Sequence, residues 1–373
     1  MDMKIGRKRD QQSSALWNRR LTLQLLRRHG RLSRRQLAEM TELRGSTLTY
    51  IVRDLTEQGI VRQAGKRESD TVGQKQILLE IDADAGWTLG LDLRKEEAQL
   101  VIQDAAGHTV DDHLVPMRQD LLDVPKVLKK KVSRFLEAKG RPAGECLGMG
   151  VGVPGVVDHR QGLVVISRDF DCTDVPLGKL FQEQFEVPVL IDNNANLATL
   201  AEARVGAGVE LSSFVYFLIH HIKLGDDIIF NKAYGCGLYL DGKLHRGFHY
   251  AAGEIDDSLQ PSSEDFCMAK SEIEVLAQAT NRISENAKKF ARMLGGTVAH
   301  LINLIDPKAV VIGAAFPLEN REFLDEIRKS AALEVIPIHH RQVSIVPDAL
   351  GHLAIAFGAA TAAAENAFFD KSI

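Results

Sequence analysis

The sequence predicts an α/β protein in two parts, a small head of helices with a β-hairpin and a large body in which strands alternate with helices. The chain has 373 residues, more than one hydrophobic core usually holds. Apolar residues recur with helical spacing before residue 83, and strand-like runs alternate with amphipathic stretches after it. Charge is also divided unequally between the two parts. We therefore expect one domain at 1–82 and a second at 83–373.

Composition and charge narrow the class of protein. Hydrophobic residues make up 45% and charged residues 26% of the chain, which is typical of folded globular proteins. Residues 1–75 contain 17 Lys+Arg and 8 Asp+Glu, a balance of +9, whereas the rest contains 29 and 42, a balance of −13. A basic head on an acidic body indicates a module that binds a polyanion. No apolar run fits a membrane span or a secretory signal, so we expect a cytoplasmic protein without membrane contact.

The cysteines predict neither disulfides nor a metal site. The chain contains four, and no two form a C-x-x-C clip: Cys146, Cys172, Cys236 and Cys267. Free cysteines are usually reduced and buried in a cytoplasmic protein. We expect no bound cofactor.

The first elements of the head are two helices. Apolar spacing over residues 14–28 predicts the first, and Gly30 is a typical residue to end it. Ser33 is placed to cap a short second helix, with Gln36 three residues later completing a capping box.

A third helix and a hairpin complete the head. Ser46 is expected to cap the helix, and its apolar side chains should face inward: Leu48, Ile51, Val52 and Leu55. Gly59 ends this helix. Strand-like runs at 60–62 and 76–79 flank a polar loop at 65–75 and predict the hairpin.

Three short helices followed by a hairpin form a winged helix-turn-helix, whose third helix fits the major groove of double-stranded DNA. The residues expected to contact bases or phosphates project from this helix and from the hairpin: Arg44, Ser46, Thr47, Thr49, Tyr50, Arg53, Lys66 and Arg67. For any single one of them a solvated helix face is the alternative, because only about three or four side chains of a reading helix reach bases.

The body alternates strands with amphipathic helices. Helices are expected at 124–139 and 284–305, and strand-like runs lie at 88–93, 98–104, 147–157, 187–191, 214–219, 309–312 and 343–346. These elements are too many for a single lobe with one hydrophobic core, so we expect two lobes. A cleft between two lobes is a natural ligand site. We expect the lobes at 83–195 with 350–373, and at 196–349.

Four segments of the body resemble, in order, the motifs of one family. Residues 148–158 resemble a G-x-G-V-P-G-x-V-D turn, and 187–202 a P-V-x-x-x-N-D-A-N-x-x-A-x-x-E segment. Residues 235–255 resemble a glycine-rich run followed by A-G-E-I, and 303–313 the entry to a late strand. The chain resembles ROK-family transcriptional regulators of the N-acetylglucosamine/xylose repressor type, which are sugar-responsive repressors related to bacterial sugar kinases. The resemblance implies an actin-like (ribonuclease H-like) two-lobed sugar-kinase fold behind the winged helix-turn-helix.

The departures from this family pattern argue against catalysis. Kinase members carry a G-G-T phosphate loop after the first strand, where this chain has Arg94-Lys95-Glu96. The family's catalytic Asp falls on Asn194, and an amide cannot act as a general base. Gly313-Ala314-Ala315 replaces three glycines on the adenine side. The zinc-binding His falls on Asp257, and the cysteine run that should follow is missing. We predict no enzyme activity and no zinc.

The resemblance implies a partial sugar site. Asn193 and Glu254 retain the positions that bond sugar hydroxyls, and Asn194 and Asp257 retain polarity with altered chemistry. Arg168 nearby favours an acidic or phosphorylated sugar, with a surface ion pair as the alternative. Helix capping is the alternative for the two asparagines.

Together these features predict a repressor of carbohydrate-use genes that binds a palindromic operator as a homodimer or homotetramer and responds to a sugar or sugar derivative. Two other hypotheses stay open. One is a regulator whose degenerate sensor domain docks another protein instead of a sugar. The other is an active sugar kinase that carries a DNA-binding head.

Overall fold

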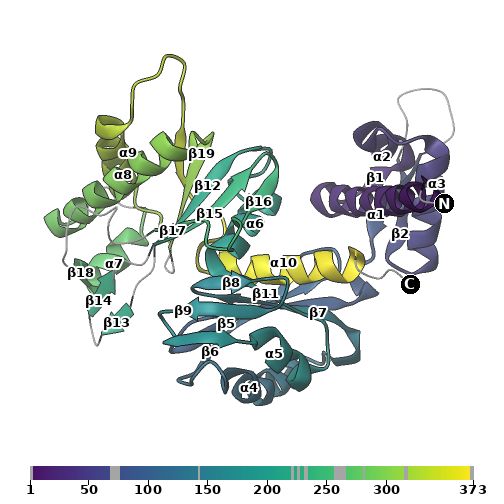
Figure 1. The fold of residues 1–373 in the computed structure, drawn as a ribbon, viewed down its shortest axis with the longest axis horizontal. Helices are drawn as coiled ribbons and strands as arrows, with labels where there is room; N and C mark the ends of the chain where they lie inside the picture. The colour runs from purple at the N-terminus through teal and green to yellow at the C-terminus, as the bar shows by residue number, and fades with distance from the viewer. Residues whose placement is uncertain are drawn as a thin grey trace.

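The computed structural model describes residues 3–67, 76–141, 143–219, 222–224, 227–230, 234–255, 266–279, 282–314 and 318–369. Figure 1 shows the head at the right and two lobes at the left, with helix α10 (Ala354–Phe369) running from the junction of the lobes toward the head. Within the described ranges, no helix is both long and apolar enough to cross a membrane.

The head contains the predicted three helices and hairpin and, in addition, a two-residue strand after the first helix. Its elements are α1 (Met3–His29), β1 (Leu32–Ser33), α2 (Arg34–Thr41), α3 (Gly45–Glu57), β2 (Val61–Arg67) and β3 (Gln76–Ile81). The strands form one sheet in the order β1-β3-β2, and β2 pairs antiparallel with β3, which confirms the hairpin. Most of the predicted loop, residues 68–75, lies outside the described part of the chain.

Local capping signals were predicted well with one exception. The capping box at Ser33 is confirmed, because the Ser33 hydroxyl accepts from the Gln36 amide at 3.2 Å and the Gln36 side chain accepts from the Ser33 amide at 2.9 Å. The prediction that Ser46 caps the third helix is wrong. The Leu48 amide donates to the Arg44 carbonyl at 3.1 Å, so α3 starts at Gly45 and Arg44 takes the N-cap position without a side-chain bond.

The start of α1 and the strand at 147–157 also differ from the prediction. Helix α1 begins at Met3 rather than near residue 14, because its first turns are polar and carry no apolar stripe that periodicity could register. The single strand expected at 147–157 is two strands, β7 (Cys146–Val153) and β8 (Val156–Asp158). Gly155 separates them at a φ of 110°, and a Cβ there would lie 2.2 Å from the Ile166 carbonyl oxygen.

The first lobe is built on a five-stranded sheet in the order β11-β7-β4-β5-β6. The remaining strands of this sheet are β4 (Trp87–Leu93), β5 (Glu97–Asp104), β6 (Thr109–Pro116) and β11 (Val189–Asn193). A smaller antiparallel sheet joins β8 to β9 (Leu163–Ser167) and β10 (Cys172–Val175), and α4 (Val124–Ala138) and α5 (Leu177–Phe185) complete the lobe. Leu128, Val132 and Phe181 pack into the core beneath the sheet.

The second lobe is built on a sheet in the order β16-β15-β12-β19-β20, with β17 paired to β15. Its strands are β12 (Phe214–Ile219), β15 (Tyr234–Leu240), β16 (Lys243–His245), β17 (Glu254–Ile255), β19 (Ala309–Ala314) and β20 (Ser344–Pro347). Helices α8 (Glu285–Ile305) and α9 (Arg321–Glu334) pack on it. A small sheet, β13 (Ile222–Leu224), β14 (Asp227–Phe230) and β18 (Phe266–Ala269), lies beside α7 (Lys270–Leu276).

Helix α6 (Asn194–Val205) and α10 cross where the lobes meet. A Cβ at Gly90 would lie 1.8 Å from the Ala356 carbonyl oxygen, so α10 lies close against the first-lobe sheet. A Cβ at Gly358 would lie 1.9 Å from the Leu197 carbonyl oxygen, so the two helices also touch backbone to backbone. These small residues allow the lobes to meet at a tight helix crossing.

Candidate nucleic-acid interface and interlobe site

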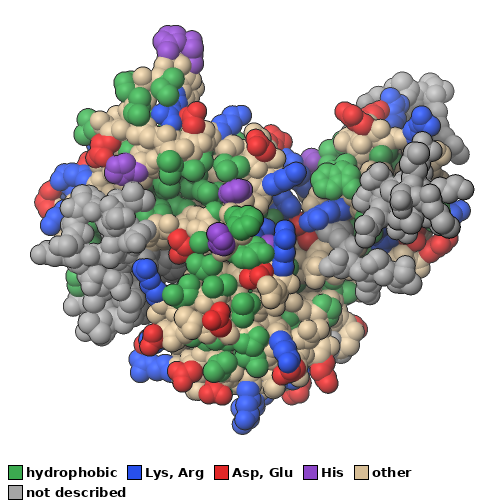
Figure 2. All heavy atoms as spheres, in the orientation of Figure 1, with side chains coloured by type: hydrophobic (Ala, Val, Ile, Leu, Met, Phe, Trp, Pro, Cys, Tyr) green, Lys and Arg blue, Asp and Glu red, His purple; other side chains and the backbone are tan. Residues whose placement is uncertain are grey.

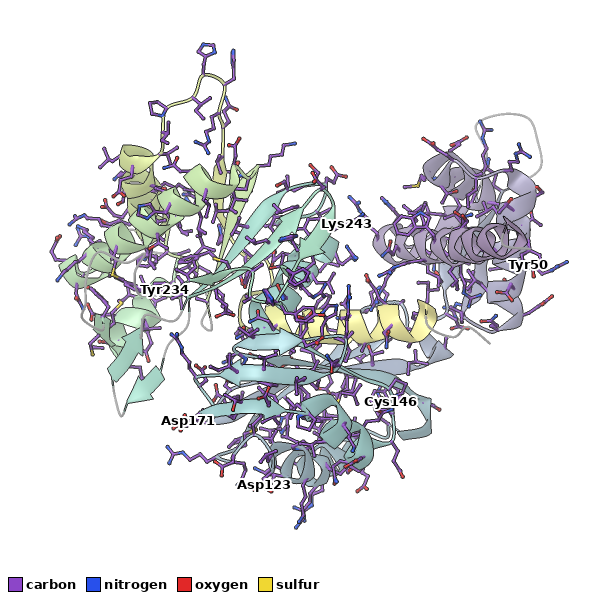
Figure 3. The ribbon with its side chains drawn as sticks, in the orientation of Figure 1. Tyr50, Asp123, Cys146, Asp171, Tyr234 and Lys243 are labelled. Carbon is purple, nitrogen blue, oxygen red and sulfur yellow. The ribbon has the colours of Figure 1, made fainter. Side chains whose placement is uncertain are left out.

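Helix α3 has the two faces that the sequence predicted. Leu48, Ile51, Val52 and Leu55 are buried, whereas Thr47, Thr49, Tyr50 and Arg53 are exposed. Tyr50 is 64% exposed, and the Arg53 guanidinium lies 5.3 Å from the centroid of its ring. Figure 3 shows Tyr50 on the side of the head turned away from the lobes, where a duplex can approach it.

The start of α3 adds a favourable place for phosphate. Arg44 and Ser46 are exposed there, beside the positive end of the helix dipole. Lys66 and Arg67 end strand β2 instead of lying in the loop, because β2 continues to Arg67. Their side chains lie outside the described part of the chain.

Sequence reasoning missed how the reading helix is held. Arg19 on α1 forms an ion pair with Asp54 on α3 and donates to the Gln58 side chain at 2.6 Å. These contacts tie the C-terminal end of α3 to α1. They join residues 35 and 39 positions apart, which is beyond any local pattern.

In the body, the structure brings two of the predicted sugar residues, Asn193 and Glu254, together. Asn193 caps α6, because its Oδ1 accepts from the Asn196 amide at 3.1 Å. Its Nδ2 donates to the Gly155 carbonyl at 2.8 Å and lies 3.5 Å from Glu254 Oε1. The capping role and the site role are therefore compatible in one side chain. Asn194 follows directly, while Asp257 lies outside the described residues.

Asn194 and Glu254 differ in their surroundings. Asn194 is only 4% exposed, and its Oδ1 accepts from the Ala195 amide at 2.8 Å. Glu254 is exposed, but the protein atoms around its carboxyl raise its pKa. The positive charge of Arg168 lowers this pKa, and the negative charge of Asp169 raises it further. Arg168 thus acts electrostatically on Glu254, and a positive group stands beside the polar cluster as the sequence suggested.

An ion pair between the lobes closes one side of this cluster, and sequence reasoning missed it. Arg246 of the second lobe donates to Asp192 Oδ2 through Nη2 at 2.6 Å and Nε at 2.9 Å. Asp192 Oδ1 accepts from the Asn193 amide at 2.8 Å. The His159 ring meets Tyr250 edge-on at 5.4 Å, and its buried Nδ1 has no hydrogen-bond partner among the residues that the structure describes. Burial and Arg246 lower the pKa of His159.

The segment where kinases carry a phosphate loop is closed. The Arg94 amide donates to the Glu97 carbonyl at 2.9 Å, so residues 94–97 form a tight turn. The Arg94 guanidinium pairs with buried Asp92 at 2.7 Å and Glu97 at 3.2 Å, and Asp92 raises the pKa of Arg94. No described residues gather three or more His, Cys, Asp or Glu side chains as a metal site would require.

Comparison with known sequences relates both parts of the chain to described families. Residues 88–268 match the ROK family, and residues 18–62 match the winged helix-turn-helix DNA-binding family. A xylose repressor of Caldicellulosiruptor bescii is 23% identical, over 84% of this chain and 86% of its own length. A xylose repressor of Bacillus subtilis is 23% identical, over 91% and 93%. An N-acetylglucosamine repressor of Escherichia coli O6:H1 is 20% identical, over 88% and 87%.

Solved structures share the fold. A ROK family transcriptional regulator, a homologue of the Escherichia coli MLC protein, superposes with a TM-score of 0.72 at 20% identity and covers 95% of this chain and 97% of its own. A ROK family glucokinase from Streptomyces griseus, in complex with glucose and AMPPNP, has a TM-score of 0.60 at 21% identity and covers 74% and 99%. The predicted fold, a winged helix-turn-helix followed by an actin-like two-lobed unit, is confirmed.

Proposed function

We propose that this chain, which joins an N-terminal winged helix-turn-helix DNA-binding domain to a ROK family domain, is a transcriptional repressor of carbohydrate-use genes that responds to a sugar. One observation carries the proposal. The exposed face of α3 and the polar cluster at Asn193 and Glu254 lie in the same chain, so a DNA-reading surface is physically joined to a site suited to polyols.

The DNA part of the proposal assigns roles along α3. Thr47, Thr49 and Tyr50 face the base edges, and Arg44 and Arg53 contact phosphates or guanines. Ser46, Lys66 and Arg67 add contacts from the helix start and the hairpin. A second copy of the chain supplies the second reading helix, so the operator is a palindrome.

The sensor part places the sugar beside Asn193, Asn194 and Glu254. An amide and a carboxylate at hydrogen-bond distance offer both donors and acceptors to neighbouring hydroxyls. The family pattern makes Asp257 the fourth candidate, and it lies outside the described residues. The names of the relatives supply the first sugars to try, which are D-xylose, N-acetylglucosamine and glucose.

Isothermal titration calorimetry tests the sensor part. We expect one of these three sugars, or its phosphorylated form, to give saturable heat that Glu254→Gln and Asn194→Ala each weaken at least tenfold, about the value of one or two lost hydrogen bonds. Asn286→Ala, which removes an exposed asparagine on α8, is the matched control and should bind like the native protein. Absence of heat with every sugar would overturn sugar sensing and favour the protein-docking hypothesis.

We also propose that the protein does not transfer phosphate. The turn closed by Arg94 and the amide at Asn194 leave neither open backbone amides for a phosphate nor a general base. The test is a coupled assay for sugar-dependent formation of ADP from ATP. We expect no turnover above the ATP blank, whereas turnover abolished by Asn194→Ala would establish a kinase.

A further inference from the structure

Glu365, near the end of α10, is a buried carboxylate shared between the head and the body. It is 7% exposed. Its Oε1 accepts from Arg204 Nε at 2.6 Å, and its Oε2 lies 3.3 Å from both Arg204 Nη2 and Arg20 Nη2. Arg20 belongs to α1 and Arg204 to α6, so one carboxylate connects three helices that are distant in sequence.

The charges at this junction favour the ionised form of the carboxylate. Burial alone would raise the pKa of Glu365, but the Arg204, Arg20 and Arg27 guanidiniums outweigh burial and lower it. If either arginine moves away from a buried carboxylate that both share, the negative charge loses part of its compensation, which is strongly destabilising. Arg204 contacts both carboxylate oxygens, and Arg20 contacts Oε2.

The head is seated on α10 by apolar contacts as well. Leu23 and Leu26 of α1 belong to one buried cluster with Ala364 and Phe368 of α10. One turn further along α1, Arg27 donates to the Gln103 side chain at 2.7 Å. Figure 2 shows Lys and Arg side chains gathered where the head meets the body. The head is therefore not a freely tethered module, and its orientation depends on where α10 lies.

The two helices that share Glu365 with the head belong to different lobes. Helix α6 packs on the second-lobe sheet, where a Cβ at Gly237 would lie 1.8 Å from Thr199 Oγ1. Helix α10 packs on the first-lobe sheet, as Gly90 and Gly150 show. Rotation of one lobe against the other would therefore change the position of α6 relative to α10, and with it that of Arg204 relative to Glu365.

Helix α6 also starts at the proposed sugar site. Asn193 caps its first turn, and Arg204 lies in its last turn, roughly 15–18 Å away at 1.5 Å per residue. Glu202, on the same helix, accepts from the Ala349 amide at 3.0 Å and the Leu350 amide at 3.3 Å, just before α10 begins. A displacement at the sugar site is thus transmitted through α6 to both ends of α10, by Glu202 near its start and by Arg204 near its end.

We propose that Glu365 is the positioning residue that couples the sensor lobes to the DNA-binding head, because Arg20 of the head and Arg204 of α6 share its carboxylate. When a lobe movement draws Arg204 away from Glu365, the carboxylate interacts with Arg20 alone and fixes the head against α10. When the lobes move the other way, Arg204 competes for the carboxylate, the Arg20–Glu365 pair weakens, and the head is released. This inference rests on the proposed sugar-responsive repressor function.

The test compares operator affinity with and without the sugar found by calorimetry, using fluorescence anisotropy on the full-length protein. The coupling is the ratio of the two Kd values, and allosteric ratios are typically about 5–150. We expect Glu365→Gln and Arg20→Gln to bring the ratio within about twofold of one, with sugar affinity unchanged. Arg28→Gln is the matched control, because Arg28 lies on the same helix and joins the head to Glu210 by an exposed pair at 3.1 Å.

The outcomes distinguish failure of the proposed sugar response from failure of the proposed coupling through Glu365. Native protein whose operator affinity no sugar changes would refute the sugar response and the coupling with it. Native protein that responds, together with an Arg20→Gln variant that responds equally, would refute the coupling alone. Arg20 is the deciding position if Glu365→Gln does not fold, because its side chain is 42% exposed and its removal leaves the Arg204–Glu365 pair intact.

Discussion

Replacing Asp348 by Asn should stabilise the protein at pH 8 much more than at pH 5. Asp348 follows strand β20, borders a cavity of about 710 Å³ and accepts a hydrogen bond from the Tyr216 hydroxyl at 3.0 Å. Burial, and then the nearby Glu202 carboxylate, raise its pKa from 3.8 to about 7. The folded state therefore holds this proton more tightly than the unfolded chain, and the resulting stability is complete below pH 3.8 and lost as pH rises to about 7.

The magnitude follows from these pKa values. Between pH 5 and pH 8 the native protein loses about 2.6 kcal/mol from this group, at 1.36 kcal/mol per pH unit. Because Asp348 is only partly buried at the edge of the cavity, solvent screens its charge, and we expect about half of this, ~1.3 kcal/mol. An amide does not titrate, so the variant does not undergo this decrease in the free energy of unfolding between pH 5 and pH 8.

Urea denaturation at the two pH values measures the effect. The free energy of unfolding of Asp348→Asn relative to the native protein should rise by about 1.3 kcal/mol from pH 5 to pH 8. Asp325→Asn is the control, because Asp325 lines the same cavity as an exposed partner of Arg328. The reasoning is refuted if the difference between variant and native protein is the same at both pH values.

Three further predictions concern the head, its seat on the body and the closed turn. Arg53→Ala should weaken operator binding on the order of tenfold in anisotropy titrations, and unchanged affinity would exclude Arg53 from the interface. Gly107→Val should destabilise the protein by about 1–3 kcal/mol in urea denaturation, because Gly107 has a φ of 95°, which strains a β-branched residue, and the new Cβ would also lie 2.3 Å from Arg27 Nε. Native stability of this variant would contradict the strain. Arg94→Met should cost about 3 kcal/mol or more in the same assay, because it leaves Asp92, 1% exposed, without its cation; a neutral effect would mean that Asp92 is not charged.

Features set by local sequence were predictable. The capping box at Ser33 and the inward face of α3 depend on residues three or four positions apart, and both are confirmed. The motifs around Asn193 and Glu254 also led to residues that meet in space. In each case the signal lay within one short segment.

Features set by contacts across the chain were not predictable. The ion pair of Arg246 with Asp192 spans 54 positions, and that of Arg20 with Glu365 spans 345. No periodicity reports such pairs, because they depend on how whole elements are placed in the fold. The polar start of α1 was missed for a different reason, since helix formers without an apolar stripe give no amphipathic signal.

The measurement that tests the central claim most directly is fluorescence anisotropy of the purified protein on DNA from upstream of its own gene, against a scrambled duplex at physiological salt. The account predicts binding to the natural duplex ~10³-fold tighter or more, and weakening of that binding by the sugar that calorimetry identifies. Equal and steeply salt-dependent binding to both duplexes would mean that the basic head makes phosphate contacts alone. That result, repeated across the promoters of neighbouring carbohydrate-use genes, would contradict a sequence-specific repressor.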